Sequence, residues 1–253
     1  TVASITPVIV DPETLFLILT SNVKYNPTAT TKGQATIESN VRTTITNYNT
    51  DKLNTFNGLF RHSELLGLID DTDTSITSNS VNVSLAKLLT PTLGDSKSYK
   101  IYYNNALSNP HSGHNASSGG ITASTGFGIT GQTGLEFFFD DDGAGNLRIY
   151  RLVSGVRTYY DSAAGTVDYS SGVISINPIS ISSVSNVDGA ISTEIRITVT
   201  PDSFDVIPKR NQLLEIDLVN TSITASSDTV AQGNDSGNAS FTTTSSYTTP
   251  SSY

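Results

Sequence analysis

The feature that most constrains the fold of this sequence is the stretch between about residues 98 and 218. Short apolar runs alternate there with turn residues at close intervals, and no segment has convincing helical periodicity. Residues 142–146 and 170–172 contain Gly, Asp, Asn and Ser, which tolerate a positive φ and favour hairpin turns. The pattern predicts an antiparallel meander or sandwich. The expected strands are residues 100–103, 121–129, 135–139, 147–153, 157–160, 167–169, 173–176, 194–200 and 213–218.

The first 92 residues combine strand and helix signals. Residues 15–25 begin as a continuous apolar run and then alternate, which predicts a strand covered on both faces at its start and half-buried later. Residues 81–85 alternate throughout and predict a strand with one solvent-facing side. Between them, apolar residues spaced four, four and three apart predict a helix that buries one stripe. The stripe consists of Ile37, Val41, Ile45 and Tyr48.

Two helix starts are expected in this segment. Thr31 followed by Gln34 matches a capping box for the first helix, and Ser63 is the expected cap of a short second helix over residues 63–69. The order strand, helix, helix, strand predicts a small sheet with helices on one face. The predicted class is therefore α+β, with a mixed domain over residues 1–92 and an antiparallel β domain over residues 93–218.

Residues 219–253 are rich in Ser, Thr, Asn and Gly and contain few large apolar side chains. Such a stretch buries too little surface to offset its ordering entropy alone, so we expect a low-complexity tail, or an arm that is ordered only on a neighbour. Pro91 and Gly94 lie between the two expected domains and are the candidate hinge residues.

Composition argues against several functional classes. The net charge is −9 and the 14 Lys and Arg residues are scattered, whereas nucleic-acid binding needs clustered basic residues. No apolar run approaches the ~18 residues of a membrane span. Without Cys, the chain has no disulfide, thiol nucleophile or Cys-built metal site. It also lacks Met, so we expect it to be part of a longer translation product.

Two acidic stretches resemble the start of a calcium loop. Residues 71–75 and 140–142 place side-chain oxygens at alternate positions. Such a loop also needs a carboxylate at its twelfth position, where this chain has Asn82 and Arg151. We therefore interpret both stretches as turns or helix termini.

No constellation of residues in the sequence favours catalysis. His111 and His114 lie in a loop rich in Pro, Gly and Ser, and two imidazoles form a metal site only with a third ligand from elsewhere. No nucleophile elbow or phosphate-binding glycine loop occurs. We expect no catalytic residue, cofactor, metal or small-molecule substrate. A pair of Glu residues meeting in space would still allow a glycan-degrading enzyme fragment, which stays open as a third hypothesis.

A series of short motifs carries a family resemblance. In chain order they are residues 49–56 (Asn-Thr-Asp-Lys-Leu-Asn-Thr-Phe), 60–65 (Phe-Arg-His-Ser-Glu-Leu), 68–73, 76–79, 139–146, 165–174 and 205–212. Taken together, they resemble the baseplate J-like family of contractile-tailed phages, and within it the C-terminal portion of the large baseplate wedge proteins of myoviruses. The resemblance covers about residues 10 to 218.

The resemblance implies a virion component of the tail baseplate rather than an enzyme. It implies a homodimer that joins other wedge subunits into a ring around the hub, assembled in the host cytoplasm and rearranged on tail contraction. Arg210 is the candidate interface residue, since its guanidinium can bind a carboxylate across an interface, with a local surface ion pair as an equal alternative. The alternative function is an adhesin or carbohydrate-binding β module of a tail fibre or cell surface.

Overall fold

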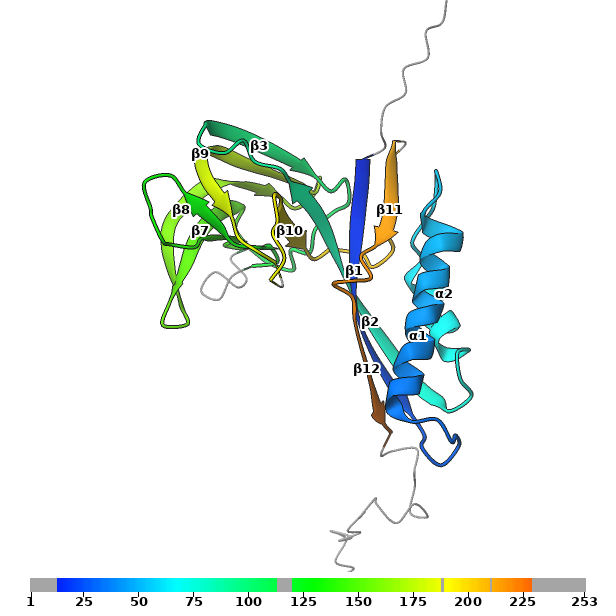
Figure 1. The fold of residues 1–253 in the computed structure, drawn as a ribbon. Coiled ribbons are helices and arrows are strands. Elements are labelled where there is room, and N and C mark those ends of the chain that lie inside the picture. Colours follow the sequence, from blue (N-terminus) through cyan, green and yellow to red (C-terminus); the bar gives the residue numbers. More distant parts are fainter. Residues whose placement is uncertain (1–12, 113–119, 188, 210, 229–253) are drawn as a thin grey trace, which may run out of the picture.

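The computed structural model describes residues 13–112, 120–187, 189–209 and 211–228, and within them the strands form two six-stranded sheets (Figure 1). The first sheet contains β1 (Glu13–Tyr25), β2 (Ile76–Leu89), β4 (Ala123–Ser124), β10 (Ile195–Val199), β11 (Gln212–Ile216) and β12 (Ser222–Ser227). The second contains β3 (Ser96–Tyr102), β5 (Phe127–Ile129), β6 (Phe138–Asp141), β7 (Asn146–Val153), β8 (Val156–Asp168) and β9 (Val173–Val184). This mixture of strands and a few helices confirms the expected α+β class.

Helices cover one face of the first sheet (Figure 1). They are α1 (Gln34–Tyr48), the π-helical turn η1 (Asn49–Leu53) and α2 (His62–Asp70). The predicted stripe of α1 is confirmed, because Ile37, Val41, Ile45 and Tyr48 are all buried. Alternate residues of β1 and β2 are buried as well, as the period of two in a strand requires.

The predicted helix caps are wrong. α1 begins after Gly33 and α2 after Arg61, and neither start has a side-chain cap from its own N-cap residue. The first N–H of α2, on His62, instead donates a 2.9 Å hydrogen bond to Oδ1 of Asp205. Because the capping carboxylate lies far away in the sequence, no local motif could indicate it.

The first sheet is larger than the predicted pair of strands. Its order is β11-β1-β2-β10-β4, with β12 also paired to β1. The expected strands at 194–200 and 213–218 therefore belong to this sheet and not to the β domain. β11 and β12 both run parallel to β1, one after the other along the same strand. The expected tail beginning at residue 219 is corrected too, since residues 222–227 form β12; residues 229–253 lie outside the described residues.

In the second sheet β6, β7, β8 and β9 follow one another as antiparallel neighbours, while β3 and β5 both pair with β9. The turn at residues 142–146 joins β6 to β7, with Gly143 and Gly145 at positive φ, and the turn at 170–172 joins β8 to β9, with Gly172 at φ +66°. The expected strands at 157–160 and 167–169 are parts of the single long strand β8. One hydrophobic core cluster continues through both sheets.

The expected hinge lies in the link between β2 and β3. Pro91 is buried. Gly94 donates its N–H to the carbonyl of Ile181 at 2.8 Å and accepts the hydroxyl of Ser180 at 2.9 Å. The chain also passes between the sheets from β3 to β4, from β4 to β5 and from β9 to β10. A rotation of one sheet against the other has to bend every one of these links, and the hinge role of Pro91 and Gly94 remains a proposal.

Candidate functional site

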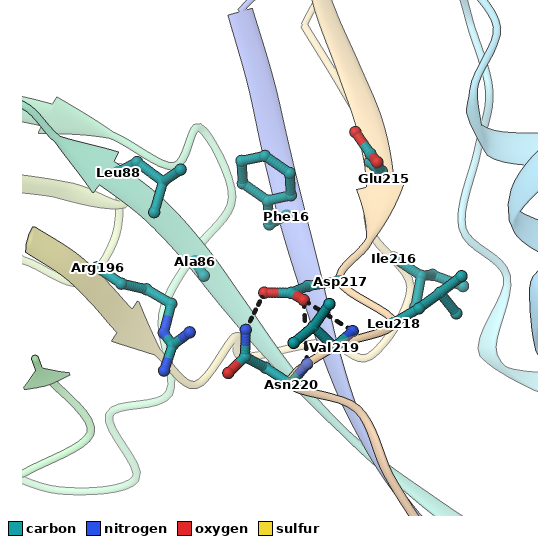
Figure 2. Close-up of a pocket in the computed structure, with 10 residues that line it drawn as sticks. All are labelled: Phe16, Ala86, Leu88, Arg196, Glu215, Ile216, Asp217, Leu218, Val219 and Asn220. Carbon is teal, nitrogen blue, oxygen red and sulfur yellow. Dashed lines mark hydrogen bonds between the residues drawn. The ribbon is translucent and has the colours of Figure 1, made fainter. Parts of the chain in front are cut away.

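A groove of about 450 Å³ lies where β1, β2, β10 and β11 meet the loop that leads to β12. Figure 2 shows the side chains that line it. They are Phe16, Ala86, Leu88, Arg196, Glu215, Ile216, Asp217, Leu218, Val219 and Asn220.

Strand register explains why the groove has an apolar centre. Phe16 of β1 is paired with Ala86 of β2 on one side and with Glu215 of β11 on the other, so the three side chains share one face of the sheet. That face is opposite to the one that buries Leu15 and Leu17 beneath the helices. The apolar run at the start of β1 thus has apolar side chains on both faces of the strand. The face away from the helices, which carries Phe16, is only partly buried.

Two opposite charges flank this centre. Figure 2 shows Arg196 on one side and Glu215 on the other, with Phe16 and Ala86 between them. Neither Arg196 nor Glu215 forms an ion pair with another described residue. Leu88, paired with Arg196 in the register, is 43% exposed. The groove therefore combines exposed apolar surface with two charges available to a partner.

The loop beside the groove is a hydrogen-bonded turn. Oδ1 of Asp217 accepts the backbone N–H groups of Val219 at 3.1 Å and Asn220 at 3.0 Å. Nδ2 of Asn220 donates to Oδ2 of Asp217 at 2.6 Å. These bonds hold Val219 in the solvent, where it is 88% exposed. Leu88 and Val219 therefore add exposed apolar surface to the groove.

Comparison with known proteins identifies a relative of the segment that contains β1, both helices and most of β2. Residues 13–88 match the family model described as baseplate structural protein gp6, C-terminal domain III. Over residues 13–88 the resemblance to a baseplate wedge protein is confirmed. The matched segment, here called the gp6-like domain, runs from β1 through both helices to Leu88 in β2. It contributes Phe16, Ala86 and Leu88 to the groove. No curated protein matches the chain.

The acidic stretch at the end of the gp6-like domain's second helix is a turn, as expected. The carboxylate of Asp73 binds the ammonium of Lys32 and accepts hydrogen bonds from the N–H and hydroxyl of Ser75. The Lys32 bond and the Ser75 bonds lower the pKa of Asp73 to about 2. A carboxylate held by these partners stabilises the connection from α2 to β2.

The second acidic stretch also has structural partners. Asp140 binds Nε of Arg148 at 2.9 Å, Nη1 of Arg157 at 2.6 Å and the hydroxyl of Tyr159 at 3.1 Å. Asp142 accepts the N–H groups of Ala144 and Asn146 within its own hairpin turn. Among the described residues, no group of three or more His, Asp or Glu side chains is arranged to hold a metal ion.

The other residues considered from the sequence, Arg210 and the three histidines, do not form a common site among the described residues. Arg210 and His114 lie outside the described residues, and His111 lies in the loop after β3. The ring of His62 hydrogen-bonds the carbonyl of Val81 at 2.7 Å and packs on Phe204, both structural contacts. No helix in the described part of the chain is long and apolar enough to span a membrane.

Sequence reasoning missed Arg196 and Glu215. The only available signal was the apolar run of residues 15–19, which predicted a strand covered on both faces. The side chains around Phe16 come from strands remote in the sequence, so no local sequence pattern indicates that they lie close together.

Proposed function

We propose that this protein is a structural component of a phage tail baseplate wedge. The observation that carries the proposal is the match of residues 13–88 to a baseplate structural domain. The groove supports a role exercised through subunit contacts, since its exposed apolar and charged side chains suit a protein partner.

A second copy of the chain is the proposed occupant of the groove face. In a two-fold dimer each contact occurs twice, with the roles of the two copies exchanged. Arg196 of one copy would then face Glu215 of the other, with Phe16 and Leu88 of both copies packed between the two ion pairs. The placement of opposite charges on either side of an apolar centre makes this face self-complementary.

The wider assembly is proposed from the resemblance. Dimers would join other wedge subunits into a ring around the hub that rearranges on contraction, within a virion assembled in the host cytoplasm. Pro91 and Gly94 stay the proposed hinge, and Arg210 stays a proposed interface residue.

A carbohydrate-binding β module is the second candidate function. Tyr102 and Tyr160 are 45% and 51% exposed on the second sheet, and aromatic faces of this kind stack on sugar rings. Binding of the protein to a glycan array, with loss of binding in Tyr160→Ala, would favour this function over the baseplate role.

Light scattering over a concentration series tests the dimer. We expect the unaltered chain to dimerise, and Arg196→Glu or Glu215→Arg to weaken the dimer at least about tenfold through like-charge contacts. The double variant, which exchanges the two charges, should restore it. Lys100→Glu and Asp161→Lys are matched charge reversals at exposed positions of the second sheet and should leave the mass unchanged.

A monomer at every concentration of the unaltered chain would contradict dimerisation. Equal weakening by the single and double variants would contradict the proposed pairing of Arg196 with Glu215.

A further inference from the structure

Polar side chains of α1 and η1 bind the backbone of β11, β12 and the turn between them. Oε1 of Glu38 accepts the N–H of Ala225 at 2.9 Å. Arg42 donates to the carbonyls of Leu218 at 3.0 Å and Thr221 at 3.3 Å. Oδ1 of Asn49 accepts the N–H of Ile216 at 2.7 Å. Glu38, Arg42 and Asn49 thus face the free edge of β11 and β12 and contact only main-chain groups there.

The strand β12 is held mainly through its backbone. It pairs with β1 over the register Thr20–Ser222 to Tyr25–Ser227. Of its side chains only Ala225 is buried, and the remainder are exposed or half-buried. β12 thus pairs with β1 along its length and is contacted by Glu38 of α1, and we call the place between β1 and α1 that it occupies the slot. Because every amino acid offers the same backbone groups, this slot recognises a strand with little dependence on its sequence.

The connection into β12 contains more residues than the sheet requires. Leu17 is paired with Ile216 and Thr20 with Ser222, so three steps along β1 correspond to six steps along the second segment. The three additional residues lie in the turn at residues 217–221, where Val219 is exposed and Thr221 is buried. Between these two paired stretches, the hydroxyl oxygen of Thr221 accepts the N–H of Leu19 at 3.2 Å. Three extra residues, when extended, add a reach of ~10 Å without disturbing β11.

We propose that the slot between β1 and α1 accepts the strand Ser222–Ser227 from a second copy of the chain, linking the two copies by strand exchange. The donated strand has the same sequence, so it reproduces the pairing of residues 222–227 with β1 and the bond to Glu38. The turn at residues 217–221, which bonds Leu19 and Arg42, changes conformation. The gp6-like domain contains the whole slot but not the strand, which places the receptor and the donated segment in separable parts of the chain. Exchange moves the turn at residues 217–221, which also lines the groove, but the pairing of the exchanged strand with β1 involves neither Arg196 nor Glu215.

Cysteine crosslinking in the full chain tests the exchange, because the chain contains no natural Cys. Asn22 and Thr224 are register partners, and both are exposed. Neighbouring strands lie ~4.8 Å apart, within the Cα separation that a disulfide accepts. A chain carrying Asn22→Cys is mixed with one carrying Thr224→Cys, incubated and mildly oxidised. Disulfide-linked heterodimers are then measured by non-reducing electrophoresis and mass spectrometry.

Exchange predicts a heterodimer yield at least about tenfold above a control mixture of Asn22→Cys and Ser171→Cys chains, since Ser171 is exposed in the distant turn between β8 and β9. The double variant Asn22→Cys with Thr224→Cys in one chain shows that the register itself closes a disulfide. A yield no higher than the control, with full closure within the double variant, would overturn the proposal.

Repeating the mixture in the Arg196→Glu background separates exchange from the groove dimer. The heterodimer should persist there. Its loss would assign the crosslink to proximity in the groove dimer and would overturn exchange.

Discussion

The hydroxyl of Tyr103 donates a 2.8 Å hydrogen bond to the carbonyl of Ile197. Tyr103 follows β3 of the second sheet and Ile197 lies in β10 of the first, so this bond joins the two sheets inside the common core. Tyr103 is fully buried, and burial raises the pKa of its hydroxyl far above the usual range. The hydroxyl is therefore a neutral donor at all physiological pH values.

Tyr103→Phe should lower the free energy of unfolding by about 1 to 3 kcal/mol, because it leaves the Ile197 carbonyl without this partner in a buried site. Urea denaturation measures the loss. Tyr102→Phe is the matched control, since Tyr102 is the preceding residue and is 45% exposed. Equal effects of the two substitutions would show that the bond contributes nothing to stability.

Asp140→Asn should lower the free energy of unfolding by about 3 to 5 kcal/mol, since it leaves Arg148 and Arg157 without their shared carboxylate. The Asp140 side chain is 1% exposed and that of Arg148 8%. Thermal unfolding followed by circular dichroism provides the measurement. Asp161→Asn removes an exposed carboxylate from β8 and should change stability by less than about 0.5 kcal/mol. A small loss for Asp140→Asn would mean that the arginines find other partners.

Gly172→Ala and Gly155→Ala should differ although both glycines have a positive φ. A Cβ at Gly155 would meet nothing within 4 Å, so only backbone strain of about 1 kcal/mol is expected. A Cβ at Gly172 would collide with the backbone carbonyl of Asn105. Its cost should exceed that of Gly155→Ala by at least about 2 kcal/mol in denaturant titrations. Similar costs would show that the loop containing Asn105 yields easily.

Asp73→Asn should lower stability at pH 7 by about 1 to 2 kcal/mol and have a much smaller effect at pH 2. The pKa of Asp73 is lowered to about 2 in the folded state from a usual value of 3.8. Its contribution is thus complete above about pH 5 and is lost as the pH falls through about 2. Unfolding measured from pH 2 to 7 checks this, with Asp71→Asn as the exposed control nearby. A pH-independent difference would contradict the ionic origin of the effect.

The sequence predicted those elements that are specified by residues of their own segment. The stripe from Ile37 to Tyr48 predicted α1, and the glycines of residues 142–146 predicted a hairpin turn; both are present. The family resemblance is confirmed over residues 13–88, while the motifs quoted from later in the chain lie beyond that match.

Elements that depend on remote partners were missed. β12 has a polar sequence and is ordered by backbone bonds to β1 and Glu38 rather than by a buried apolar face. The cap on α2 comes from Asp205. The groove pairs Phe16 with Glu215 through a parallel contact whose register no local pattern specifies. These features depend on which segments the fold brings together. The sequence of any one segment does not specify those partners.

The placement of β11 and β12 on β1 also determines when the first sheet can be completed. The bond from Leu19 to Thr221 spans 202 positions in the chain. At a synthesis rate of ~5 to 20 residues per second, one edge of β1 waits ~10 to 40 s on the ribosome for its partners. Until then the nascent chain presents an unpaired, apolar strand edge beside α1. Such an edge is a site for chaperone contact or for pairing between neighbouring nascent chains.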